Sequence, residues 1–366
     1  MKILVVQDHL RSGGTERQSI LLARAFAAAG HPTTLLTFRP GGALGGELSG
    51  VRRNSLLPFD LHLDWFAPRL LHTVASTAQD VVLCMGRMAN CYAGFIQRSC
   101  PQVAVIGTMR TGKPLPWLFR RSLRRVRHIV ANSHAARQTL IDTLRLPAAN
   151  ITVIHNSLVF SEGIGAIRNE ALRAQWGASP KTLVLLCVAM FRHGKNQKEL
   201  IDLVSGLPAD LDWQLWLAGD GATRTACEHA VAARRLGARV RFLGWQRDPT
   251  PLYQAADIAV HASQTESLSN FIIEAQAHGL PAVVYDAQGI SECFLPGETG
   301  FVLSRGDRDG FRQAVEQLAR ATPAEREARA AQARTYAATT FDPQRHVREY
   351  LDLLGRLAGA GVHSAL

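Results

Sequence analysis

The sequence predicts an α/β protein made of two halves, each a doubly wound parallel sheet with helices on both faces. Short, continuously apolar runs alternate with helical patterns along the chain, which is typical of parallel strands buried on both sides. The alternation restarts at LVLLCVAM, residues 183–190, after a polar and loop-like stretch at residues 160–181. One restart in a chain of 366 residues indicates two domains of similar size.

The strands predicted for the first half are short runs rich in β-branched and other apolar residues. They lie at residues 2–6, 33–38, 81–84, 103–108, 128–132 and 151–155. The second half has such runs at residues 183–190, 213–219, 238–244, 257–263 and 281–286. Helical patterns fill the intervals, as at residues 17–31, where Gly30 supplies the stop. The predicted domains are residues 1–165 and 175–340, and residues 341–366 are expected to form a C-terminal helix that packs back on the first domain.

The formal net charge of +11 is concentrated in the first half of the chain. Residues 1–160 contain 19 Lys and Arg against 7 Asp and Glu, so the remainder is close to neutral. A one-sided excess indicates a surface that meets something anionic: nucleic acid, an anionic membrane or a charged acceptor. The densest patch is WLFRRSLRRVRH, residues 117–128.

The sequence also bears on the cellular compartment. The N-terminal run MKILVV becomes polar too soon for a signal peptide and is interpreted as a buried first strand. No stretch reaches the roughly 18 apolar residues of a membrane span. The six cysteines form no C-x-x-C pair, and we expect them to be buried thiols in a reducing compartment. The prediction is a cytoplasmic protein.

Two strand-to-helix turns carry residues suited to phosphate. In SGGTERQ, residues 12–18, Gly14 allows close backbone approach, and the helix that follows offers unpaired amides. A plain tight turn explains this stretch as well, because the G-x-G-x-x-G pattern is incomplete. In AMFRHGKNQKEL, residues 189–200, Arg192 and Lys195 place a guanidinium fork and a point charge after a strand, which suits a diphosphate. A solvated basic turn is the alternative.

A further helix is predicted at residues 268–278, within TESLSNFIIEAQAHGLP. Ser267 or Ser269 is the expected N-cap, and Gly279 follows the end. The amides of Leu268 and Ser269 at the N-terminus of this helix are candidates to receive phosphate oxygens.

Two carboxylates flank that N-terminus. Glu266 precedes the helix, and Glu274 lies within it among the apolar Phe271, Ile272 and Ile273. A carboxylate buried there is costly unless hydroxyl groups donate to it, and a ribose diol would serve. Glu266, on the other side of the phosphate position, would meet a second polyol, a sugar. The spacing suggests two acids that hold the two ends of a nucleotide-sugar, and a pair of solvated acids is the alternative.

In these motifs the chain resembles the retaining glycosyltransferases of family four, whose GT-B fold has two Rossmann-like domains facing across a cleft. The strongest part of the resemblance is Glu266, seven residues and then Glu274, set in TESLSNFIIEAQAHGLPAVVYDAQGISE and followed by GETGFVL. GGTER, VANS, VIHNS, FRHGKNQKEL and LAGDG occur in the expected order and extend it over almost the whole chain. The resemblance implies an acceptor-binding first domain and a nucleotide-sugar-binding second domain.

The resemblance also implies roles for single residues. Glu266, Lys195 and Arg192 would be catalytic: Glu266 would contact the donor sugar, and the two cations would bind the diphosphate and stabilise the leaving group. The donor-binding residues would be Glu274 on the ribose, Gly14, Leu268, Ser269, Gly219 in LAGDG and Asn156 in VIHNS. The leaving phosphate would help to deprotonate the acceptor, so that no protein nucleophile is needed. No cofactor and no metal ion is expected, because Arg, Lys and helix dipoles would take the place of a metal.

The sequence departs from the family pattern at three places. Glu266 is followed by Ser-Leu-Ser where relatives have Gly-Phe/Leu-Gly, which puts side chains where the backbone would approach closely. Asn156 is followed by Ser rather than Gly. Where many relatives carry a His late in the first domain, this chain has GTMRTGKP, and Arg110 is the candidate for that position, with Lys113 behind it. Arg110, Lys113 and His9 are candidate acceptor-binding residues, and solvated or structural roles are the alternative.

The basic segment runs from Trp117 through Leu118 and Phe119 into five arginines that end at Arg127. Such a pattern is typical of an amphipathic face on an anionic membrane, and a solvated helix face is the alternative. The sequence contains no recognised nucleic-acid module, so nucleic acid is not expected as a partner. Peripheral attachment to the inner face of the cytoplasmic membrane, through Trp117 to Arg127, is therefore a hypothesis of the sequence.

The predicted function is retaining transfer of a sugar from a nucleotide diphosphate-sugar, with UDP the first expectation, to a saccharide or lipid-linked saccharide. The product would belong to lipopolysaccharide, exopolysaccharide or glycolipid synthesis. The alternatives are a GT-B phosphorylase or sugar-nucleotide epimerase, and a non-catalytic GT-B scaffold that binds polyanions or membranes. The donor base and sugar, the acceptor and the oligomeric state stay open.

Overall fold

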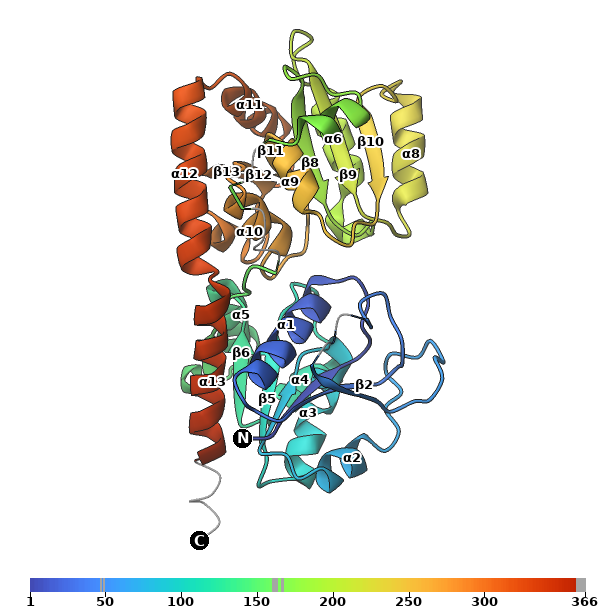
Figure 1. Ribbon diagram of the computed structural model, residues 1–366, viewed down its shortest axis with the longest axis vertical. Helices are drawn as coiled ribbons and strands as arrows, with labels where there is room; N and C mark the ends of the chain where they lie inside the picture. Colours follow the sequence, from blue (N-terminus) through green and yellow to red (C-terminus); the bar gives the residue numbers. More distant parts are fainter. Residues whose placement is uncertain (47, 49, 160–163, 166–167, 360–366) are drawn as a thin grey trace. The chain divides into compact units, whose positions relative to one another are not determined.

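The computed structural model describes residues 1–46, 48, 50–159, 164–165 and 168–359 (Figure 1). The chain divides into two compact units, Met1–Val159 with Pro343–Leu366, and Phe160–Asp342. Each unit is built on one parallel sheet covered by helices, which confirms the predicted α/β class. Residues 166–167, between the two predicted domains, and residues 360–366, at the end of the predicted C-terminal segment, lie outside the described part.

The first unit contains a seven-stranded parallel sheet with the order β3-β2-β1-β4-β5-β6-β7. Its strands are β1 (Ile3–Gln7), β2 (Thr33–Thr37), β3 (Arg52–Ser55), β4 (Val81–Cys84), β5 (Ala104–Met109), β6 (His128–Ala131) and β7 (Ile151–Val153). The chain moves outward from β1 to β3 and then returns to the other side of β1 at β4. The carboxyl ends of β1 and β4 therefore form the topological switch point, where doubly wound sheets bind ligands.

Helices cover both faces of this sheet. They are α1 (Gly14–Ala28), α2 (Leu70–Ser76), α3 (Arg87–Ser99), α4 (Trp117–Leu123), α5 (His134–Leu144) and α13 (Pro343–Gly359), with the 3-10 turn η1 (Ala148–Asn150) before β7. Successive residues of β1 face opposite sides, as strand geometry requires. Ile3 and Val5 join a core with residues of α1 and α13, and Leu4 and Val6 join a second core with residues of α2 and α3.

The helix α13 belongs to the first unit, although the second unit precedes it in sequence (Figure 1). Its Tyr350, Leu353 and Leu354 are buried in the same core as Ile3 and Phe26. The rings of Tyr350 and Phe26 lie 6.3 Å apart. The helix α13 thus covers one face of the first sheet.

The second unit contains a six-stranded parallel sheet with the order β10-β9-β8-β11-β12-β13. Its strands are β8 (Leu183–Val188), β9 (Trp213–Ala218), β10 (Val240–Gly244), β11 (Ile258–His261), β12 (Ala282–Tyr285) and β13 (Gly300–Leu303). Its switch point lies between β8 and β11, which pair directly. The loops that follow β8 and β11 therefore meet where a ligand is expected.

The helices of the second unit surround this sheet. They are α6 (Glu170–Gln175), α7 (Gln197–Val204), α8 (Arg224–Ala233), α9 (Thr250–Ala255), α10 (Asn270–Ala277), α11 (Arg308–Ala319) and α12 (Pro323–Thr340), with the 3-10 turns η2 (His193–Lys195) and η3 (Ile290–Cys293). The fully buried Arg173 fixes α6 to the unit, because its guanidinium donates to the carbonyl of Ala255 at 2.7 Å and to the carboxylate of Asp257 at 3.1 Å. Among the described residues, no helix combines the length and the apolarity needed to cross a membrane.

Strands occur at all of the predicted strand positions, and two strands were missed. The strand β3 has the polar sequence RRNS, and its residues are exposed or half-buried at the edge of the sheet. An edge strand that is wet on one side lacks the apolar signal on which the prediction depended. The other strand that was not predicted, β13, is short, and its sequence GFVL lies within the motif GETGFVL.

Candidate functional site

The switch point of the second unit holds a buried ion pair between Lys195 and Glu266. Lys195 ends the turn η2 after β8, and Glu266 lies in the loop after β11. The Oε1 atom of Glu266 accepts a hydrogen bond from Lys195 Nζ and lies 2.7 Å from Nε2 of His261, the last residue of β11. The side chains of Lys195 and Glu266 are only 14% and 7% exposed, so water screens this pair weakly.

The protonation states around Glu266 follow from burial and charge. Burial raises the pKa of Glu266, but the Lys195 charge and the hydrogen bond from His261 outweigh burial and hold that pKa well below its usual range. Burial lowers the pKa of His261, so the ring is neutral near pH 7 and Nε2 donates to the carboxylate. The other ring nitrogen lies 3.8 Å from Cys187 Sγ, and burial raises the pKa of that thiol to about 12. A hydrogen-bonded chain therefore runs from Cys187 to an ionised Glu266.

Arg192 lies in the same turn as Lys195. Its Nε atom is buried and has no hydrogen-bond partner among the described residues. An unsatisfied buried donor costs free energy, so this position favours an acceptor that the folded chain does not supply. The side-chain amide of Gln197 stabilises the turn, because its Nε2 atom donates to the carbonyls of Ala189 at 3.3 Å and Met190 at 3.0 Å.

The N-terminus of α10 reaches the same loop. Ser269 is the N-cap and Gly279, with φ at 80°, follows the end of the helix, which confirms the predicted punctuation. Leu268 and Ser269 are 6% and 3% exposed. The amide of Ser269 donates to Cys293 Sγ at 3.3 Å, so one of the two amides predicted to receive phosphate already has a weak acceptor.

Glu274 lies within α10 and is 6% exposed. The hydroxyl of Tyr253, on α9, donates to its Oε2 at 2.6 Å. The sequence predicts hydroxyl donors for this acid from a ligand, and the protein itself supplies one. The ring of Tyr253 stacks with those of Phe271 and His278, at centroid distances of 6.2 and 5.2 Å, so the position of the hydroxyl is well defined.

His261 and Tyr253, the neighbours of the two acids, are not among the site residues predicted from the sequence. The available signal for His261 was a histidine in the otherwise apolar run DIAVHAS, five residues before Glu266. Nothing in the sequence linked Tyr253 to Glu274, which are 21 positions apart. Their contact depends on the packing of α9 against α10.

Gly219 connects the loop after β9 to the turn that carries Arg192 and Lys195. Its φ is +135°, and a Cβ atom at this position would lie 2.1 Å from the carbonyl oxygen of Ala189. Its amide donates to the carbonyl of Gly244 at 2.7 Å. The structure thus gives Gly219 a backbone packing role beside the site.

Replacing Gly219 with alanine is expected to lower the free energy of unfolding by about 2 kcal/mol or more, because the side chain meets backbone and the φ is strained. Denaturant unfolding measures the effect. The matched control is Gly237→Ala, where an added Cβ meets nothing within 4 Å. Equal stability of the two variants would contradict the packing role.

The switch point of the first unit is occupied by Asp8, which follows β1 and was not predicted. Its carboxylate accepts from the amides of Met88 at 3.0 Å and Ala89 at 2.7 Å, at the start of α3. Burial raises the pKa of Asp8 to about 6 despite these bonds. The neighbouring His9, a predicted acceptor residue, is 8% exposed, and its Nε2 donates to the carbonyl of Pro40 at 3.1 Å. Burial, with a contribution from the Arg39 charge, lowers the pKa of His9.

The first helix is tied to the motif VIHNS. Gly14 is the first residue of α1 and is exposed. One turn later, the amide side chain of Gln18 donates to the carbonyl of Ser157 at 2.7 Å and accepts from its amide at 3.2 Å. Two motifs 139 positions apart therefore meet in the first unit.

Arg110 and Asn156, both predicted site residues, are in contact. The Nη1 atom of Arg110 donates to Asn156 Oδ1 at 2.6 Å, and Nη2 donates to the hydroxyl of Tyr350 at 3.3 Å. Lys113 is half-buried, and its amide donates to Thr111 Oγ1 at 3.2 Å.

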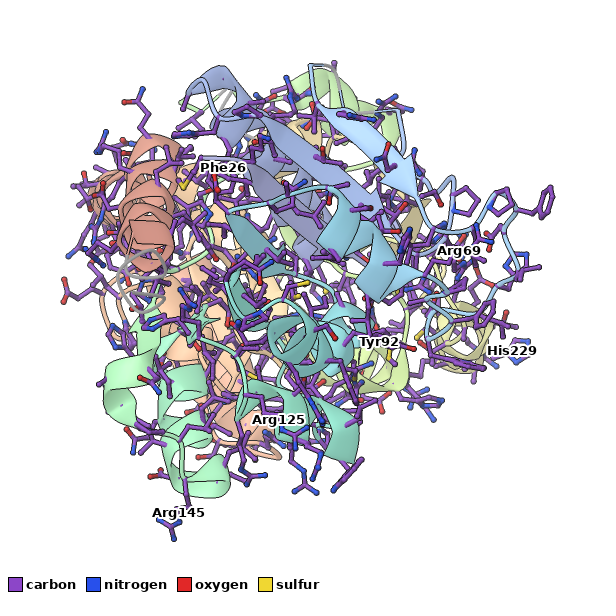
Figure 2. All side chains as sticks on the ribbon, turned by 90° about the horizontal axis from the view of Figure 1, so that it is seen from below. Phe26, Arg69, Tyr92, Arg125, Arg145 and His229 are labelled. Carbon is purple, nitrogen blue, oxygen red and sulfur yellow. The ribbon has the colours of Figure 1, made fainter. Side chains whose placement is uncertain are left out.

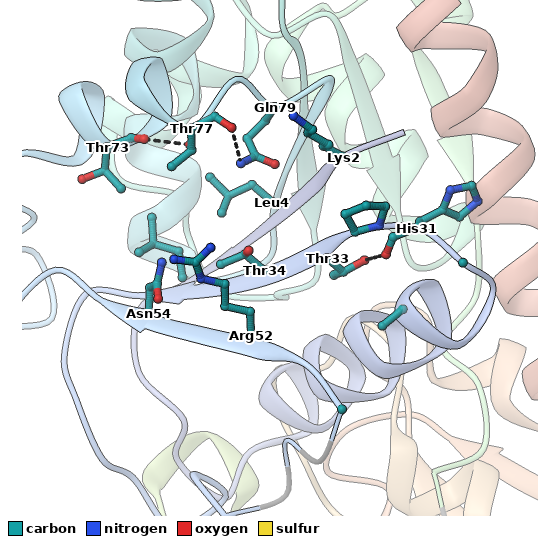
Figure 3. Close-up of a pocket in the computed structure, with 15 residues that line it drawn as sticks. Lys2, Leu4, His31, Thr33, Thr34, Arg52, Asn54, Thr73, Thr77 and Gln79 are labelled. Atoms are coloured by element: carbon teal, nitrogen blue, oxygen red, sulfur yellow. Dashed lines mark hydrogen bonds between the residues drawn. The ribbon is translucent and has the colours of Figure 1, made fainter.

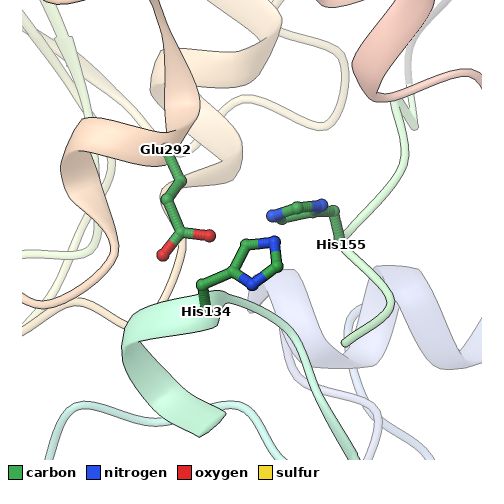
Figure 4. A group of neighbouring side chains, drawn as sticks. All are labelled: His134, His155 and Glu292. Carbon is green, nitrogen blue, oxygen red and sulfur yellow. The ribbon is translucent and has the colours of Figure 1, made fainter. Parts of the chain in front are cut away.

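Two histidines lie beside this group. His155 precedes Asn156, and its ring lies 5.5 Å from that of His134, the first residue of α5 (Figure 4). The cap of α5 is Ser133, in the motif VANS, whose hydroxyl accepts from the amide of Ala136 at 3.0 Å. The motifs VANS and VIHNS therefore meet at the carboxyl ends of β6 and β7.

The sequence contains two Asp-x-Asp triplets, a spacing that can hold a divalent cation, at residues 210–212 and 307–309. Their carboxylates are already engaged in the structure. Asp212 accepts from the hydroxyl of Thr182 at 2.7 Å, and Asp307 caps α11 through the amide of Gly310 at 2.9 Å. Neither triplet lies in the loops that carry Lys195 and Glu266.

A hollow of about 660 Å³ lies in the first unit, away from the switch point (Figure 3). Lys2, His31 and Thr33 line it, so it opens at the amino ends of β1 and β2. Ligands of doubly wound sheets bind at the carboxyl ends, and the predicted site residues do not line this hollow. We therefore assign the candidate site to the switch point rather than to the hollow.

Two family models match the chain. The model of glycosyl transferases group 1 matches residues 168–336, and the model of glycosyltransferase family 4 matches residues 12–158. The lipopolysaccharide core biosynthesis glycosyltransferase LpsE of Rhizobium meliloti is 34% identical over 146 residues, which are 40% of this chain and 42% of LpsE. The N-acetyl-alpha-D-glucosaminyl L-malate synthase of Bacillus anthracis is 28% identical over 40% of this chain and 39% of its own length. The chain thus spans less than half of the length of these curated relatives.

Solved structures share the fold over nearly the whole chain. The Anabaena protein Alr3699/HepE, solved in complex with UDP and glucose, has a TM-score of 0.82 at 22% identity and covers 97% of this chain and 99% of its own. WaaG, a glycosyltransferase involved in lipopolysaccharide biosynthesis, has a TM-score of 0.77 at 16% identity, with coverage of 97% and 99%. These similarities support the predicted GT-B fold of the two units.

Proposed function

Because the chain belongs to the family-four glycosyltransferases, we propose that it transfers a sugar from a nucleotide diphosphate-sugar to a saccharide or lipid-linked saccharide. The observation that carries this proposal is the buried Lys195–Glu266 pair beside the unsatisfied donor of Arg192. Two cations near a helix N-terminus suit a diphosphate, and a carboxylate next to them suits sugar hydroxyls. UDP is the proposed nucleotide.

The comparisons support this choice of substrates. The Anabaena protein was solved with UDP and with UDP-glucose, and LpsE is named for lipopolysaccharide core biosynthesis. Since the named relatives are glycosyltransferases, they favour transfer over a phosphorylase or epimerase activity. We propose an acceptor from lipopolysaccharide, exopolysaccharide or glycolipid synthesis.

In this proposal the residues of the second unit hold the donor. Arg192 and Lys195 bind the diphosphate, Glu266 binds the sugar hydroxyls, and Glu274 binds the ribose with Tyr253 as its fixed neighbour. His261 keeps Glu266 oriented through its Nε2–H. We assign donor binding to the backbone at three positions of the second unit: Leu268, Ser269 and Gly219. Gly14 and Asn156 of the first unit are assigned to donor binding as well. Arg110, Lys113 and His9 are assigned to the acceptor.

The proposed reaction retains the configuration at the anomeric carbon. The bond from that carbon to the diphosphate oxygen breaks, and the bond to the acceptor oxygen forms on the same face. The acceptor proton passes to the departing diphosphate, and Arg192 and Lys195 stabilise its charge. This role for the two cations supports the further proposal that the reaction needs no metal ion.

A thermal-shift panel with UDP, GDP, ADP, CMP and their sugar conjugates, with and without EDTA, tests the proposal. We expect UDP or UDP-sugar to raise the melting temperature selectively, to the same extent with EDTA. Selective stabilisation by another nucleotide diphosphate would replace UDP but keep the transferase. If none of these compounds shifts the melting temperature, the nucleotide-sugar donor is wrong and the scaffold alternative gains support.

A further inference from the structure

The basic helix α4 supplies charge but little exposed apolar surface. Phe119 and Leu123 are buried in the core of the first unit, at 1% and 2% exposure, so Phe119 cannot belong to the membrane-facing side that the sequence suggested. Trp117 is 64% exposed and carries the guanidinium of Arg121 over its ring, 5.4 Å from the centroid. An amphipathic anchor needs more apolar area than one tryptophan.

A second segment of the first unit supplies that area. We name residues 59–66 the apolar loop. Five of its eight residues are large, apolar and exposed: Phe59 (72%), Leu61 (49%), Leu63 (38%), Trp65 (56%) and Phe66 (37%). Scattered single apolar residues are ordinary on a protein surface, but five exposed large apolar residues within one eight-residue segment are typical of an interaction site.

The apolar loop is held outward by its own acidic residues. Arg39 is 6% exposed and donates to both carboxylate oxygens of Asp60, at 2.6 and 2.8 Å, and to the carboxylate of Asp64. Arg11 binds Asp64 as well. Because Asp60 and Asp64 turn toward the unit, the apolar side chains around them point away from it. The loop is therefore shaped in advance of any partner.

The apolar loop and α4 flank the same helix, α3. The hydroxyl of Tyr92, on α3, donates to the carbonyl of Trp65 at 2.6 Å. On its other side α3 packs against α4 so closely that a Cβ on Gly94 would lie 2.9 Å from the Cα of Ser122. Phe95, the residue after Gly94 on α3, is 39% exposed. Figure 2 shows Arg69, which follows the loop, and Tyr92 on one side of this unit.

The positive charge at the end of α4 is not balanced by ion pairs. Arg120, Arg121, Arg124 and Arg125 are exposed, and within the described ranges none of them forms an ion pair. Arginines near an anionic bilayer each strengthen binding by about fivefold, and Trp and Phe side chains favour the boundary between headgroups and acyl chains. An exposed apolar loop and uncompensated arginines, both supported by α3, match the two layers of an anionic bilayer: charged headgroups and apolar acyl chains.

We propose that the apolar loop and the arginines at the end of α4, Arg120, Arg121, Arg124 and Arg125, together dock the protein on an anionic lipid bilayer, with the loop entering the interface and the arginines on the headgroups. This deepens the membrane attachment considered above and does not depend on the donor. A second copy of the chain or a protein partner would cover the apolar loop without needing the four arginines.

Co-sedimentation of the full chain with vesicles tests the proposal. We expect binding to phosphatidylcholine vesicles that contain phosphatidylglycerol and much weaker binding to pure phosphatidylcholine. The double variant Phe59→Ser/Trp65→Ser should bind about tenfold or more weakly, and Phe59→Leu/Trp65→Phe should retain binding because it keeps the apolar area. Arg121→Gln/Arg125→Gln should lose the preference for phosphatidylglycerol, whereas Arg235→Gln, an exposed arginine of the second unit, should not.

The outcomes separate this inference from the donor proposal. All five substituted residues are exposed, so circular dichroism and melting temperature should be unchanged, which establishes folding without reference to activity. If the serine variant binds vesicles as the wild type does, the apolar loop is not the anchor. If the wild type ignores vesicles but still responds to a nucleotide, the docking surface is wrong and the transferase stands. Vesicle binding without any response to nucleotides would support the docking surface and contradict the nucleotide-sugar donor.

Discussion

Replacing Lys195 with alanine is expected to lower the turnover number by roughly a hundredfold to a thousandfold, because it removes a preorganised cation from the leaving group. The same change leaves Glu266 buried beside His261 without the charge of Lys195. Removing one partner of a buried ion pair typically costs about 3 kcal/mol of folding free energy. Steady-state rates and denaturant unfolding of the one variant therefore measure both effects.

The dependence of stability on pH gives an independent check. The folded pKa of Glu266 lies below its ordinary value of 4.5, so its ionised form stabilises the wild type above that pH. This contribution is lost as the pH falls below 4.5 toward the folded pKa. The Lys195→Ala variant should lose less stability over the same interval, since its Glu266 has lost the charge that lowered the pKa.

Two matched variants separate the causes. Lys198→Ala removes an exposed lysine of the same segment and should leave rate and stability nearly unchanged. His261→Gln keeps a donor near Glu266 and should cost much less turnover than Lys195→Ala. If Lys198→Ala and Lys195→Ala behave alike, the buried pair has no special role and the site assignment fails.

Glu274→Ala is expected to weaken nucleotide binding by roughly tenfold to a hundredfold, because it removes charge-assisted hydrogen bonds to the ribose hydroxyls. Glu266→Ala should instead lower turnover while changing nucleotide affinity little, because its partner in the proposal is the sugar. Calorimetry with the nucleoside diphosphate that the thermal-shift panel selects, together with steady-state rates, measures this division. Equal effects of the two variants on nucleotide affinity and on turnover would contradict this division of roles.

Deoxynucleotides make the ribose contact specific. The wild type should prefer the ribonucleoside diphosphate to its 2′-deoxy and 3′-deoxy forms, and Glu274→Ala should lose that preference. Tyr253→Phe is the matched structural control, since it keeps the stacked ring and removes only the hydroxyl that donates to Glu274. If Glu274→Ala weakens ribo- and deoxynucleotides by the same factor, Glu274 acts on the fold of α10 and not on the ribose.

Much of this site could be placed from the sequence because its parts are local. The strands β8 and β11 can be predicted because each is a continuous apolar run. In a parallel sheet the residues that follow such strands lie at the same edge. The sequence therefore predicts that Arg192, Lys195 and Glu266 lie at one edge of the second sheet. The ends of α10 were equally local, set by Ser269 and Gly279.

The features that could not be predicted from the sequence depend on contacts between residues that are distant in sequence. The polar strand β3 is positioned by its pairing with β2 and by hydrogen bonds from Arg53 to the carbonyls of Gly41 and Gly45, and Tyr253 reaches Glu274 through the packing of two helices. Phe119 and Trp65 are both aromatic residues in polar surroundings, yet the first is buried and the second exposed. Burial is set by what packs against a side chain, which residue type alone does not specify.

The α/β class, the two sheets and the ends of α10 follow from the sequence alone, because apolar periodicity and turn chemistry involve neighbouring residues. The family follows from a resemblance, carried by several motifs in a fixed order. The tertiary structure alone decided that Glu266 is ionised between Lys195 and His261, and that the acids of the apolar loop face Arg39 while its aromatic residues face outward. The physical reason is that the pKa of a carboxyl group and the exposure of a side chain depend on the charges and atoms within a few ångströms. Folding brings those neighbours from remote positions of the chain.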